Sequence, residues 1–391
     1  MRKQVFRKNA EAVARAVGYR LLRLLFRNKP ATAPLNAASC RKILLCRYDR
    51  IGDMIVTTPV INLLREMLPE AEIHVLASPR NSSLLAHDRR VAKVYEFDGT
   101  QKPLAALRSL FARPLRAAMR KERYDAVFSL VFHKTTMAGL VANILTGAQS
   151  VKIGIAHPTR TALYSTLFNL LLPVEFERET MAELQVRLVC AAFGWEYSKE
   201  LVRYDVELSE AHTTCAQETL RAFHNHQQSD SAQKIVFYNC SAGAPARQWS
   251  LRRNEECLHL LMERFPSAHF LLNTAPHDRT LGEALHAVFP IKTTLLPASR
   301  DLLDVCALVQ LVDAVFTPET SIVHIATMYR KPLVALYSQL SYAVEWLPFG
   351  DFPFRIVLTE GEEPIESITP DEAVVAFGEV LGANTASGAG E

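Results

Sequence analysis

The stretch Lys42–Pro59, KILLCRYDRIGDMIVTTP, determines the fold class of this 391-residue chain. Its first six residues, Lys42–Arg47, form an apolar strand pattern, and a helical pattern begins at Met54 after a short polar loop. Asp53 is therefore expected where a strand passes into a helix, at the carboxyl edge of a sheet, which is where open α/β sheets bind ligands. An aspartate at this place can equally well cap the helix, so the cap and the functional carboxylate both stay open.

Strand and helix patterns alternate along the rest of the chain. Near-continuous apolar strands separated by helices indicate parallel sheets that helices cover on both faces. The expected strands are 42–47, 72–77, 93–97, 126–131, 150–155, 234–239, 269–273, 293–296, 314–316 and 333–336. The strands and helices fall into two successive groups along the chain. They predict an α/β protein of two doubly wound parallel-sheet domains that face each other across a cleft, as in many ligand-handling enzymes.

The domain limits follow from shifts in composition. Residues 225–233, NHQQSDSAQ, are polar and indicate an interdomain linker or a surface loop. We therefore expect one domain over residues 41–224 and a second over residues 234–380. The small, polar end of the chain, residues 381–391, is typical of a disordered tail.

Residues 1–40 are expected to form a separate N-terminal arm. The first thirty residues contain nine Lys or Arg and a single acid, Glu11, with apolar residues at helical spacing. A basic amphipathic helix of this kind can lie on an anionic membrane surface, although a helix packed on its own domain has the same pattern. No apolar run approaches the roughly 18 residues that a membrane-spanning helix needs, so we expect any membrane contact to be peripheral.

The bulk composition and the missing motifs argue against several classes of protein. A net charge of +3 is too small to argue for a nucleic-acid partner. The seven cysteines form no CxxC pair, which leaves a zinc or redox motif unsupported, and an odd, scattered set fits a reducing cytoplasm. The sequence contains no GxGxxG after a strand, no GxxxxGK[ST], GxSxG or HExxH, and no DxD pair at a strand end. We expect neither a cofactor nor a metal.

A second group of polar residues lies in Val312–Pro332, VDAVFTPETSIVHIATMYRKP. A short strand is followed by Glu319, and a helix then begins whose first turn contains Thr320, Ser321 and His324. The free backbone N–H groups and the positive dipole end of a helix N-terminus can bind phosphate. Ordinary capping by a hydroxyl explains a single such residue, but four polar residues at one helix entrance favour a ligand site.

Two further loops follow strands of the second domain. Asn239–Trp249, NCSAGAPARQW, contains Arg247, whose guanidinium suits a phosphate; a surface arginine beside a packed tryptophan is the alternative. Asn273–Arg279, NTAPHDR, contains Asp278, which can accept a hydrogen bond from a ribose hydroxyl or cap the next helix. Because these loops all leave the carboxyl ends of strands, we expect them to meet at one edge of the second sheet.

Together these segments resemble the signatures of the lipopolysaccharide heptosyltransferases, glycosyltransferase family nine. RYDRIGDMIVTTP is similar to their amino-terminal motif, and VDAVFTPETSIVHIAT is similar to the carboxy-terminal motif written around D-[ST]-G-x-x-H-x-A. PARQW stands where such proteins have Lys-x-Trp. The order and separations of the pieces match over about residues 40–375, so the resemblance covers nearly the whole chain outside its tails.

The resemblance implies a GT-B fold, with residues 41–224 on the acceptor side and residues 234–380 on the nucleotide-sugar side. It implies inverting, metal-independent transfer of a sugar, first of all heptose from ADP-heptose, to a lipopolysaccharide core or related glycan at the cytoplasmic face of the inner membrane. Asp53 matches the general base. The donor-binding residues carried over by position are Arg247, Asp278, Glu319, Thr320, Ser321 and His324. Lys134 is a candidate for binding the lipid-linked acceptor, whereas the basic run Arg113–Arg123 is more typical of a solvated helix face.

Three positions depart from the family pattern: Glu319 replaces the usual Asp, Ser321 the usual Gly, and Arg247 the usual Lys. Each keeps the charge or the small size, so a nucleoside-diphosphate site is still expected, while the identity of the donor sugar stays open. The alternative functions are a GT-B protein of other chemistry, such as a nucleotide-sugar epimerase, and a non-catalytic nucleotide-sugar-binding protein. An epimerase usually relies on several acids and a histidine around the nucleotide, which the Gly-Asp loop does not suggest.

Overall fold

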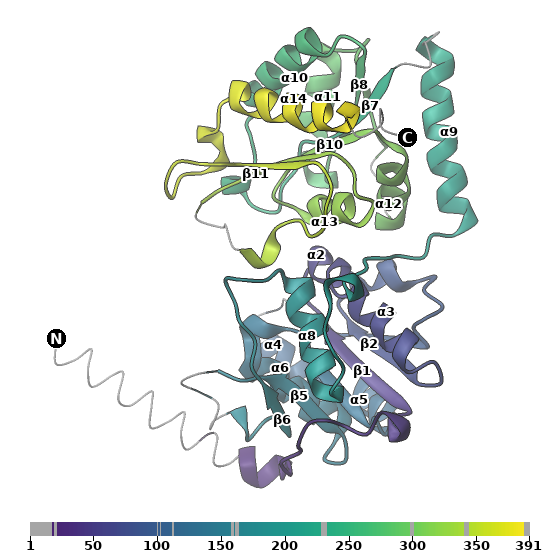
Figure 1. Cartoon of the computed structure of the whole chain (residues 1–391), viewed down its shortest axis with the longest axis vertical. Coiled ribbons are helices and arrows are strands. Elements are labelled where there is room, and N and C mark those ends of the chain that lie inside the picture. Colours follow the sequence, from purple (N-terminus) through teal and green to yellow (C-terminus); the bar gives the residue numbers. More distant parts are fainter. Residues whose placement is uncertain are drawn as a thin grey trace, which may run out of the picture. The chain divides into compact units, whose positions relative to one another are not determined.

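The computed structural model describes Gly18 and residues 22–386. Within that span it leaves out residues 100, 102, 112, 158–159, 161–163, 228–232, 298–300 and 340–343. The chain divides between Val206 and Glu207 into two compact units, called unit 1 and unit 2 (Figure 1). Each unit contains one six-stranded parallel sheet with helices on both faces, which confirms the predicted α/β architecture of two parallel-sheet domains.

Unit 1 is built on a sheet with the strand order β3-β2-β1-β4-β5-β6. The strands are β1 (Lys42–Arg47), β2 (Glu72–Ala77), β3 (Lys93–Glu96), β4 (Ala126–Ser129), β5 (Val151–Ile155) and β6 (Leu170–Leu172). In the central strand β1, Ile43 pairs with Ile73 on one side and with Ala126 on the other. Residues 43–46 are all buried because helices cover both faces, which explains the unbroken apolar run in the sequence.

The helices of unit 1 form two layers around this sheet (Figure 1). They are α2 (Ile51–Ile55), α3 (Thr58–Met67), α4 (Pro103–Leu110), α5 (Arg113–Glu122), α6 (Thr135–Thr146) and α8 (Met181–Phe193). Helices α4, α5 and α6 pack together on one face, and α3 packs with α8 on the other. The helix predicted to begin at Met54 is in fact two helices. Pro59 lies in the first turn of α3, where its missing N–H breaks no helical hydrogen bond.

Unit 2 repeats the topology of unit 1, with the strand order β12-β11-β10-β7-β8-β9. The strands are β7 (Lys234–Asn239), β8 (Ala268–Asn273), β9 (Thr293–Leu295), β10 (Ala314–Pro318), β11 (Leu333–Tyr337) and β12 (Phe354–Leu358). The first strand of the unit, β7, pairs with the fourth, β10, just as β1 pairs with β4 in unit 1.

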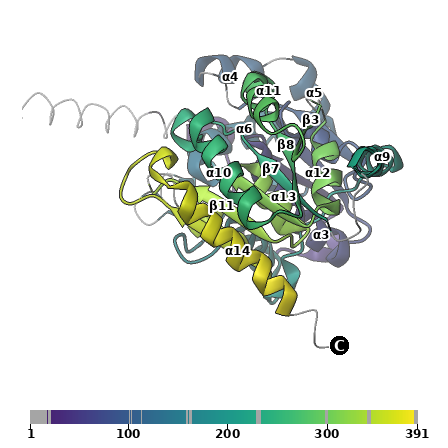
Figure 2. The same ribbon diagram turned by 90° about the horizontal axis from the view of Figure 1, so that it is seen from above.

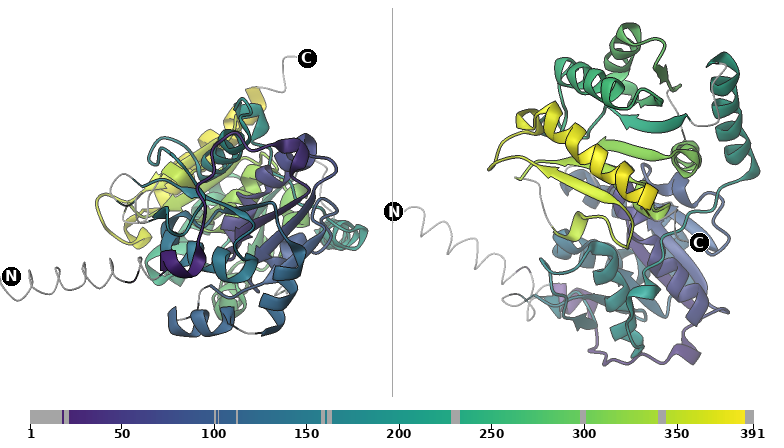
Figure 3. Two further views of the ribbon diagram at one scale, coloured as in Figure 1. Left: turned by 90° about the horizontal axis from the view of Figure 1, so that it is seen from below. Right: turned by 45° about the horizontal axis from the view of Figure 1, so that its top comes forward.

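The helices of unit 2 are α9 (Glu210–Gln227), α10 (Leu251–Arg264), α11 (Arg279–Val288), α12 (Leu302–Leu311), α13 (Ser321–Met328) and α14 (Pro370–Ala386). Helix α14 lies alongside α10 (Figure 2) and packs on β11 and β12 (Figure 3). Cys257, Leu261 and Phe377 join these helices to the core of the sheet. Helices α12 and α13 pack together on the other face.

The limits of unit 2 differ from those that composition predicted. Helix α9 packs on α12, so the predicted linker, residues 225–233, begins in the last turn of a helix of unit 2, and residues 228–232 lie outside the described residues. Residues 381–386 of the predicted tail are instead helical, because α14 continues to Ala386, and Leu381 packs on the core. Residues 387–391, like the predicted arm up to residue 21 apart from Gly18, lie outside the described residues. No helix within the described ranges is long and apolar enough to cross a membrane.

Candidate functional site

Each sheet has a switch point, where the chain leaves two neighbouring strands in opposite directions. It lies between β1 and β4 in unit 1 and between β7 and β10 in unit 2. Loops at the carboxyl ends of such strands frame the crevice in which open α/β sheets bind ligands. Asp53 follows β1 and Lys134 follows β4, while Arg247 follows β7 and Glu319 follows β10. The predicted residues of each unit therefore gather at its switch point, except Asp278, which follows β8.

Asp53 is the third residue of α2, and its side chain is buried. Its Oδ1 accepts a hydrogen bond from Nη2 of Arg47, and its Oδ2 accepts one from the backbone N–H of Arg50 at 3.2 Å. The second bond satisfies an N–H group at the start of the helix, as a cap does. The carboxylate thus stabilises the first turn of α2 and also lies at the switch point. Asp53 can therefore be both a helix cap and a functional carboxylate.

Arg47 holds the Asp53 carboxylate in place, and sequence reasoning missed it. The arginine is only 1% exposed. Its Nε donates to the backbone oxygen of Asp53 at 3.0 Å, and its Nη1 donates to the backbone oxygen of Leu130, just after β4. A buried guanidinium needs such partners, because an unpaired buried charge is very costly. The one signal in the sequence is a charged residue at the end of an apolar strand, a place where most arginines point to solvent.

Asp49 is a second carboxylate at this switch point that sequence reasoning missed. Its Oδ1 lies 3.3 Å from Nε of Arg47. Burial raises the pKa of the Asp49 carboxyl to about 6; Arg47 opposes this rise and Asp53 adds to it. The ammonium of Lys134, exposed at the start of α6, also favours the charged form of Asp49. Unit 1 therefore brings two carboxylates, one buried guanidinium and one exposed lysine to the same edge of its sheet.

The loop between β1 and α2 is fixed by two buried side chains that follow β2. Asn81 Nδ2 donates to the backbone oxygens of Arg47 at 3.2 Å and Arg50 at 3.1 Å. Ser78 Oγ donates to the backbone oxygen of Asp49 at 2.9 Å. The backbone that carries both carboxylates is therefore held by tertiary hydrogen bonds, which is the support that a catalytic group needs.

In unit 2 the predicted residues Arg247 and Glu319 form an ion pair. Nη1 of the arginine lies 3.2 Å from Oε1 of the glutamate, and the two side chains are 19% and 13% exposed. The backbone N–H of Glu319 donates to the oxygen of Leu336 in β11 at 2.9 Å. The guanidinium lies against Gly243, where an added Cβ would stand 3.7 Å from Nη2. The pair is thus partly buried, yet solvent still reaches it.

Asn239 connects three loops of unit 2, and it too was missed. Its Nδ2 lies 3.0 Å from Oγ1 of Thr317 and 3.4 Å from Oγ1 of Thr320, and its Oδ1 accepts a hydrogen bond from Asn273 at 2.9 Å. Polar side chains therefore join the carboxyl ends of β7, β8 and β10. The loops that the sequence predicts to share one sheet edge do share it.

The entrance of α13 carries the remaining predicted residues. Thr320 is the N-cap, and its Oγ1 accepts a hydrogen bond from the N–H of Ile322 at 3.2 Å. Ser321 is the first helical residue and is partly exposed. His324 is buried, with its ring centroid 6.1 Å from that of Trp346. Glu319 directly precedes the N-cap, so the guanidinium of Arg247, which pairs with Glu319, lies close to the positive end of α13. Both supply positive charge, and this arrangement suits an anion.

Asp278 lies apart from this group, in the short helix η6 (Pro276–Asp278). Its Oδ2 is 3.3 Å from Nε2 of His277. It directly precedes α11, but its side chain makes no capping hydrogen bond in the described structure. The alternative of a helix cap is therefore not supported, and a contact with ribose stays a prediction.

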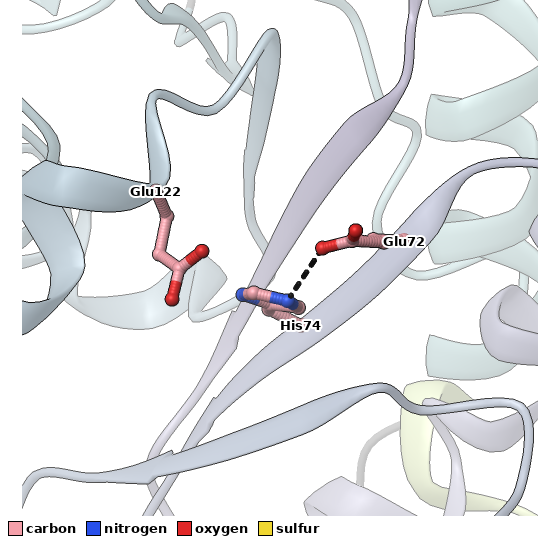
Figure 4. Close-up of side chains that lie close together, drawn as sticks. All are labelled: Glu72, His74 and Glu122. Atoms are coloured by element: carbon pink, nitrogen blue, oxygen red, sulfur yellow. Dashed lines mark ion pairs between the residues drawn. The ribbon is translucent and has the colours of Figure 1, made fainter.

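A separate cluster of Glu72, His74 and Glu122 lies at the amino edge of the unit 1 sheet, away from the switch point (Figure 4). His74 Nε2 is 3.5 Å from Glu72 Oε2. Lys42 Nζ lies 2.8 Å from an oxygen of each glutamate, and Lys93 Nζ lies 3.0 Å from Glu122. Burial lowers the pKa of His74. Because two ammonium groups already balance the carboxylates, the cluster is explained as an ion-pair network that joins β1, β2 and α5.

Three similar solved structures share this architecture. A glycosyl transferase family 9 protein from Veillonella parvula is 14% identical, with a TM-score of 0.69 over 88% of this chain and 97% of that one. E. coli heptosyltransferase WaaC, solved with ADP, is 17% identical, with a TM-score of 0.64 over 88% and 99%. E. coli ADP-heptose lps heptosyltransferase II is 19% identical, with a TM-score of 0.63 over 88% and 99%. The protein thus has the GT-B fold of these glycosyltransferases.

The sequence itself identifies the family. Residues 112–363 match the model of glycosyltransferase family 9 (heptosyltransferase). The chain therefore belongs to this family and is a glycosyltransferase, as its motifs predicted. The matched segment contains Arg247 and α13 but begins after Asp53. No curated protein sequence matches the chain.

Proposed function

We propose that the protein is an inverting, metal-independent glycosyltransferase that moves heptose from ADP-heptose to a lipopolysaccharide core or a related glycan. One observation carries the proposal: a helix N-terminus beside a guanidinium occupies the switch point of unit 2, and a firmly held carboxylate, Asp53, occupies the equivalent point of unit 1. The first suits a nucleoside diphosphate, and the second suits a hydroxyl acceptor. The donor is proposed by analogy with the E. coli relatives, whose descriptions name ADP and ADP-heptose.

Asp53 is the proposed general base. The acceptor hydroxyl oxygen attacks the anomeric carbon of the donor as the bond from that carbon to the diphosphate oxygen breaks. Asp53 takes the hydroxyl proton while the new bond forms. The diphosphate leaves with the bonding electron pair, and the configuration at the anomeric carbon inverts. Lys134 is proposed to contact acidic groups of the acceptor.

The leaving group is proposed to bind at the entrance of α13. Arg247 and the N–H groups of the helix would stabilise the negative charge that develops on the departing diphosphate. Thr320, Ser321 and His324 would add polar contacts to the phosphates, and Asp278 would accept from the ribose. Because a guanidinium and backbone N–H groups supply positive charge at this place, we propose a reaction without a metal or another cofactor.

Replacement of the proposed base tests the mechanism. Asp53→Asn keeps the size of the side chain but removes the proton acceptor, so glycosyl transfer should fall roughly 100- to 10,000-fold. Nucleotide binding should survive, since the proposed donor residues all belong to unit 2. Near-normal turnover would show that Asp53 is not the base. Asp205→Asn is the matched control, because this exposed aspartate also pairs with an arginine in unit 1. Thermal unfolding checks that the variant, in which Arg47 loses one of its two carboxylate partners, still folds.

A nucleotide-sugar screen tests the donor. Thermal-shift or calorimetric titrations with ADP-, GDP-, UDP- and CMP-sugars should show a preference for ADP. A preference for UDP or GDP would assign a different donor and leave the transferase proposal standing.

We also propose that the protein is cytoplasmic and binds the anionic surface of the inner membrane through its N-terminal arm. Residues 22–26 are helical, and Leu22 and Phe26 pack on a cluster that contains Phe168. Leu24 and Leu25 instead are 71% and 73% exposed. Exposed leucines next to a strongly basic segment are typical of a helix that lies in a membrane interface.

A further inference from the structure

Arg247, the proposed phosphate-binding cation, already has an anionic partner within unit 2. Its guanidinium lies 3.2 Å from the Glu319 carboxylate, and both side chains are largely shielded from solvent. Glu319 also directly precedes Thr320, the N-cap of α13. A carboxylate in this position balances the two sources of positive charge that a phosphate would use, the guanidinium and the helix N-terminus.

We propose that Glu319 is a built-in competitor for the phosphate site. It pairs with Arg247 when no nucleotide is bound, and it shares or releases the guanidinium when a nucleoside diphosphate enters. The inference rests on the proposed function, because it takes a diphosphate as the ligand of Arg247. A carboxylate beside a bound diphosphate repels it. Glu319 therefore lowers the affinity for the nucleotide product and speeds its release, a step that often limits the turnover of an enzyme.

A purely structural ion pair would behave in the opposite way. If Glu319 served only to orient Arg247, its loss would leave the guanidinium less ordered and weaken nucleotide binding. If Glu319 competes, its loss strengthens binding, and the gain grows with the charge of the ligand. The direction of the change and its dependence on phosphate number therefore separate the two roles.

Glu319→Gln in the full-length chain makes this test. Glutamine keeps the size and an oxygen that can accept from Arg247, but it lacks the charge. We expect ADP to bind on the order of tenfold more tightly to the variant than to the unaltered protein. AMP should gain less, and adenosine should bind both proteins equally. ADP should also inhibit glycosyl transfer at correspondingly lower concentration. If the screen favours another base, the GDP, UDP or CDP series takes the place of the ADP series.

Matched variants assign the effect to charge. Glu319→Asp keeps the negative charge and should show no tightening. Glu263→Gln removes an exposed carboxylate near the end of α10 and should leave binding unchanged. Equal or weaker diphosphate binding by Glu319→Gln would overturn the competitor role, as would equal tightening by Glu319→Asp. If neither the unaltered protein nor Glu319→Gln binds ADP, GDP, UDP or CDP, the proposed function fails and this inference fails with it.

Discussion

At the scale of the single residue, Arg47 is the shared partner of Asp49 and Asp53, the two carboxylates at the switch point of unit 1. The guanidinium is buried and contacts both Asp49 and Asp53. Without this partner, burial would disfavour the charged form of Asp49 still more strongly. One cation is shared between two acids, and burial still raises the pKa of Asp49 to about 6.

The raised pKa of Asp49 predicts a dependence of stability on pH. In the unfolded chain this carboxyl titrates near its usual value of 3.8. Between about pH 4 and pH 6 this carboxyl therefore holds its proton in the folded protein but loses it in the unfolded chain, so the contribution of Asp49 to the free energy of unfolding falls as the pH rises through this window. Asp49→Asn should remove this contribution and raise the free energy of unfolding at pH 7 by roughly 1 to 3 kcal/mol, so the difference between the variant and the unaltered protein should develop between about pH 4 and pH 6.

Denaturant unfolding at a series of pH values measures this effect. Asp205→Asn, which replaces an exposed acid of the same unit, should keep the slope of the unaltered protein. A difference in stability between Asp49→Asn and the unaltered protein that stays constant from about pH 4 to pH 6 would show that Asp49 does not titrate in this range.

Single residues also show which parts of the candidate site the sequence could predict and which it could not. Asp53 could be predicted because its place after a strand is a property of topology, which the apolar pattern preserves. Arg47 and Asn239 could not, because an inward orientation depends on partners distant in the sequence, such as Leu130 and Asn273. The ion pair between Arg247 and Glu319 joins two of the three positions that depart from the family pattern, a coupling that only the folded structure reveals.

At the scale of the element, central strands could be predicted and marginal ones could not. Strands β1, β2 and β7 begin and end where the apolar pattern predicts, because both of their faces are buried. Strand β6 has three residues, too few for a pattern, and β12 lies at a sheet edge with partly exposed side chains. Their formation depends on pairing with a neighbour already in place, which is tertiary information.

Strand β5 carries a lysine that should reduce stability at neutral pH. Lys152 is fully buried, its Nζ donates to the backbone oxygen of Ser150 at 3.0 Å, and burial lowers its pKa from the usual 10.5 to about 8. Above about pH 8 this lysine loses its proton in the folded protein while the unfolded chain keeps it, so the contribution of Lys152 to the free energy of unfolding should rise with pH until about pH 10.

Lys152→Met keeps most of the volume and removes the charge. We expect the free energy of unfolding at pH 7 to rise by roughly 1 to 3 kcal/mol and the difference from the unaltered protein to vanish near pH 10. Thermal unfolding across this pH range is the measurement. Lys199→Met, at an exposed lysine, is the control. A loss of stability at pH 7 would show that the bond to Ser150 outweighs the cost of burying the charge.

At the scale of the whole molecule, two sheets of the same strand order each place a polar site at the switch point. Alternating patterns were enough to predict this arrangement, since parallel strands and connecting helices restrict the topology. The division between the units could not be predicted from composition. The polar segment 225–233 is only the most hydrophilic part of the connection, whereas the packing of α9 on α12 assigns that helix to unit 2.

The N-terminal arm gives a prediction for the whole protein. Deletion of residues 2–21 removes six of the nine basic residues but spares the packed segment around Asn28, which donates to Asn143 at 2.9 Å. Binding to phosphatidylglycerol vesicles should fall roughly tenfold or more, while turnover of a soluble acceptor is maintained. Leu24→Ser with Leu25→Ser should weaken vesicle binding to a smaller extent. Phosphatidylcholine vesicles are the control, and unchanged binding to anionic vesicles would refute the anchor.

The place of α9 determines where family members can be recombined. His212 in this helix lies with Nε2 3.2 Å from Oδ2 of Asp301, just before α12. A chimera joined within residues 225–233 would take the helix from one parent and its packing partner from the other. A crossover between Val206 and Glu207 keeps both in one parent, so it is the junction to choose when unit 1 of one relative is combined with unit 2 of another.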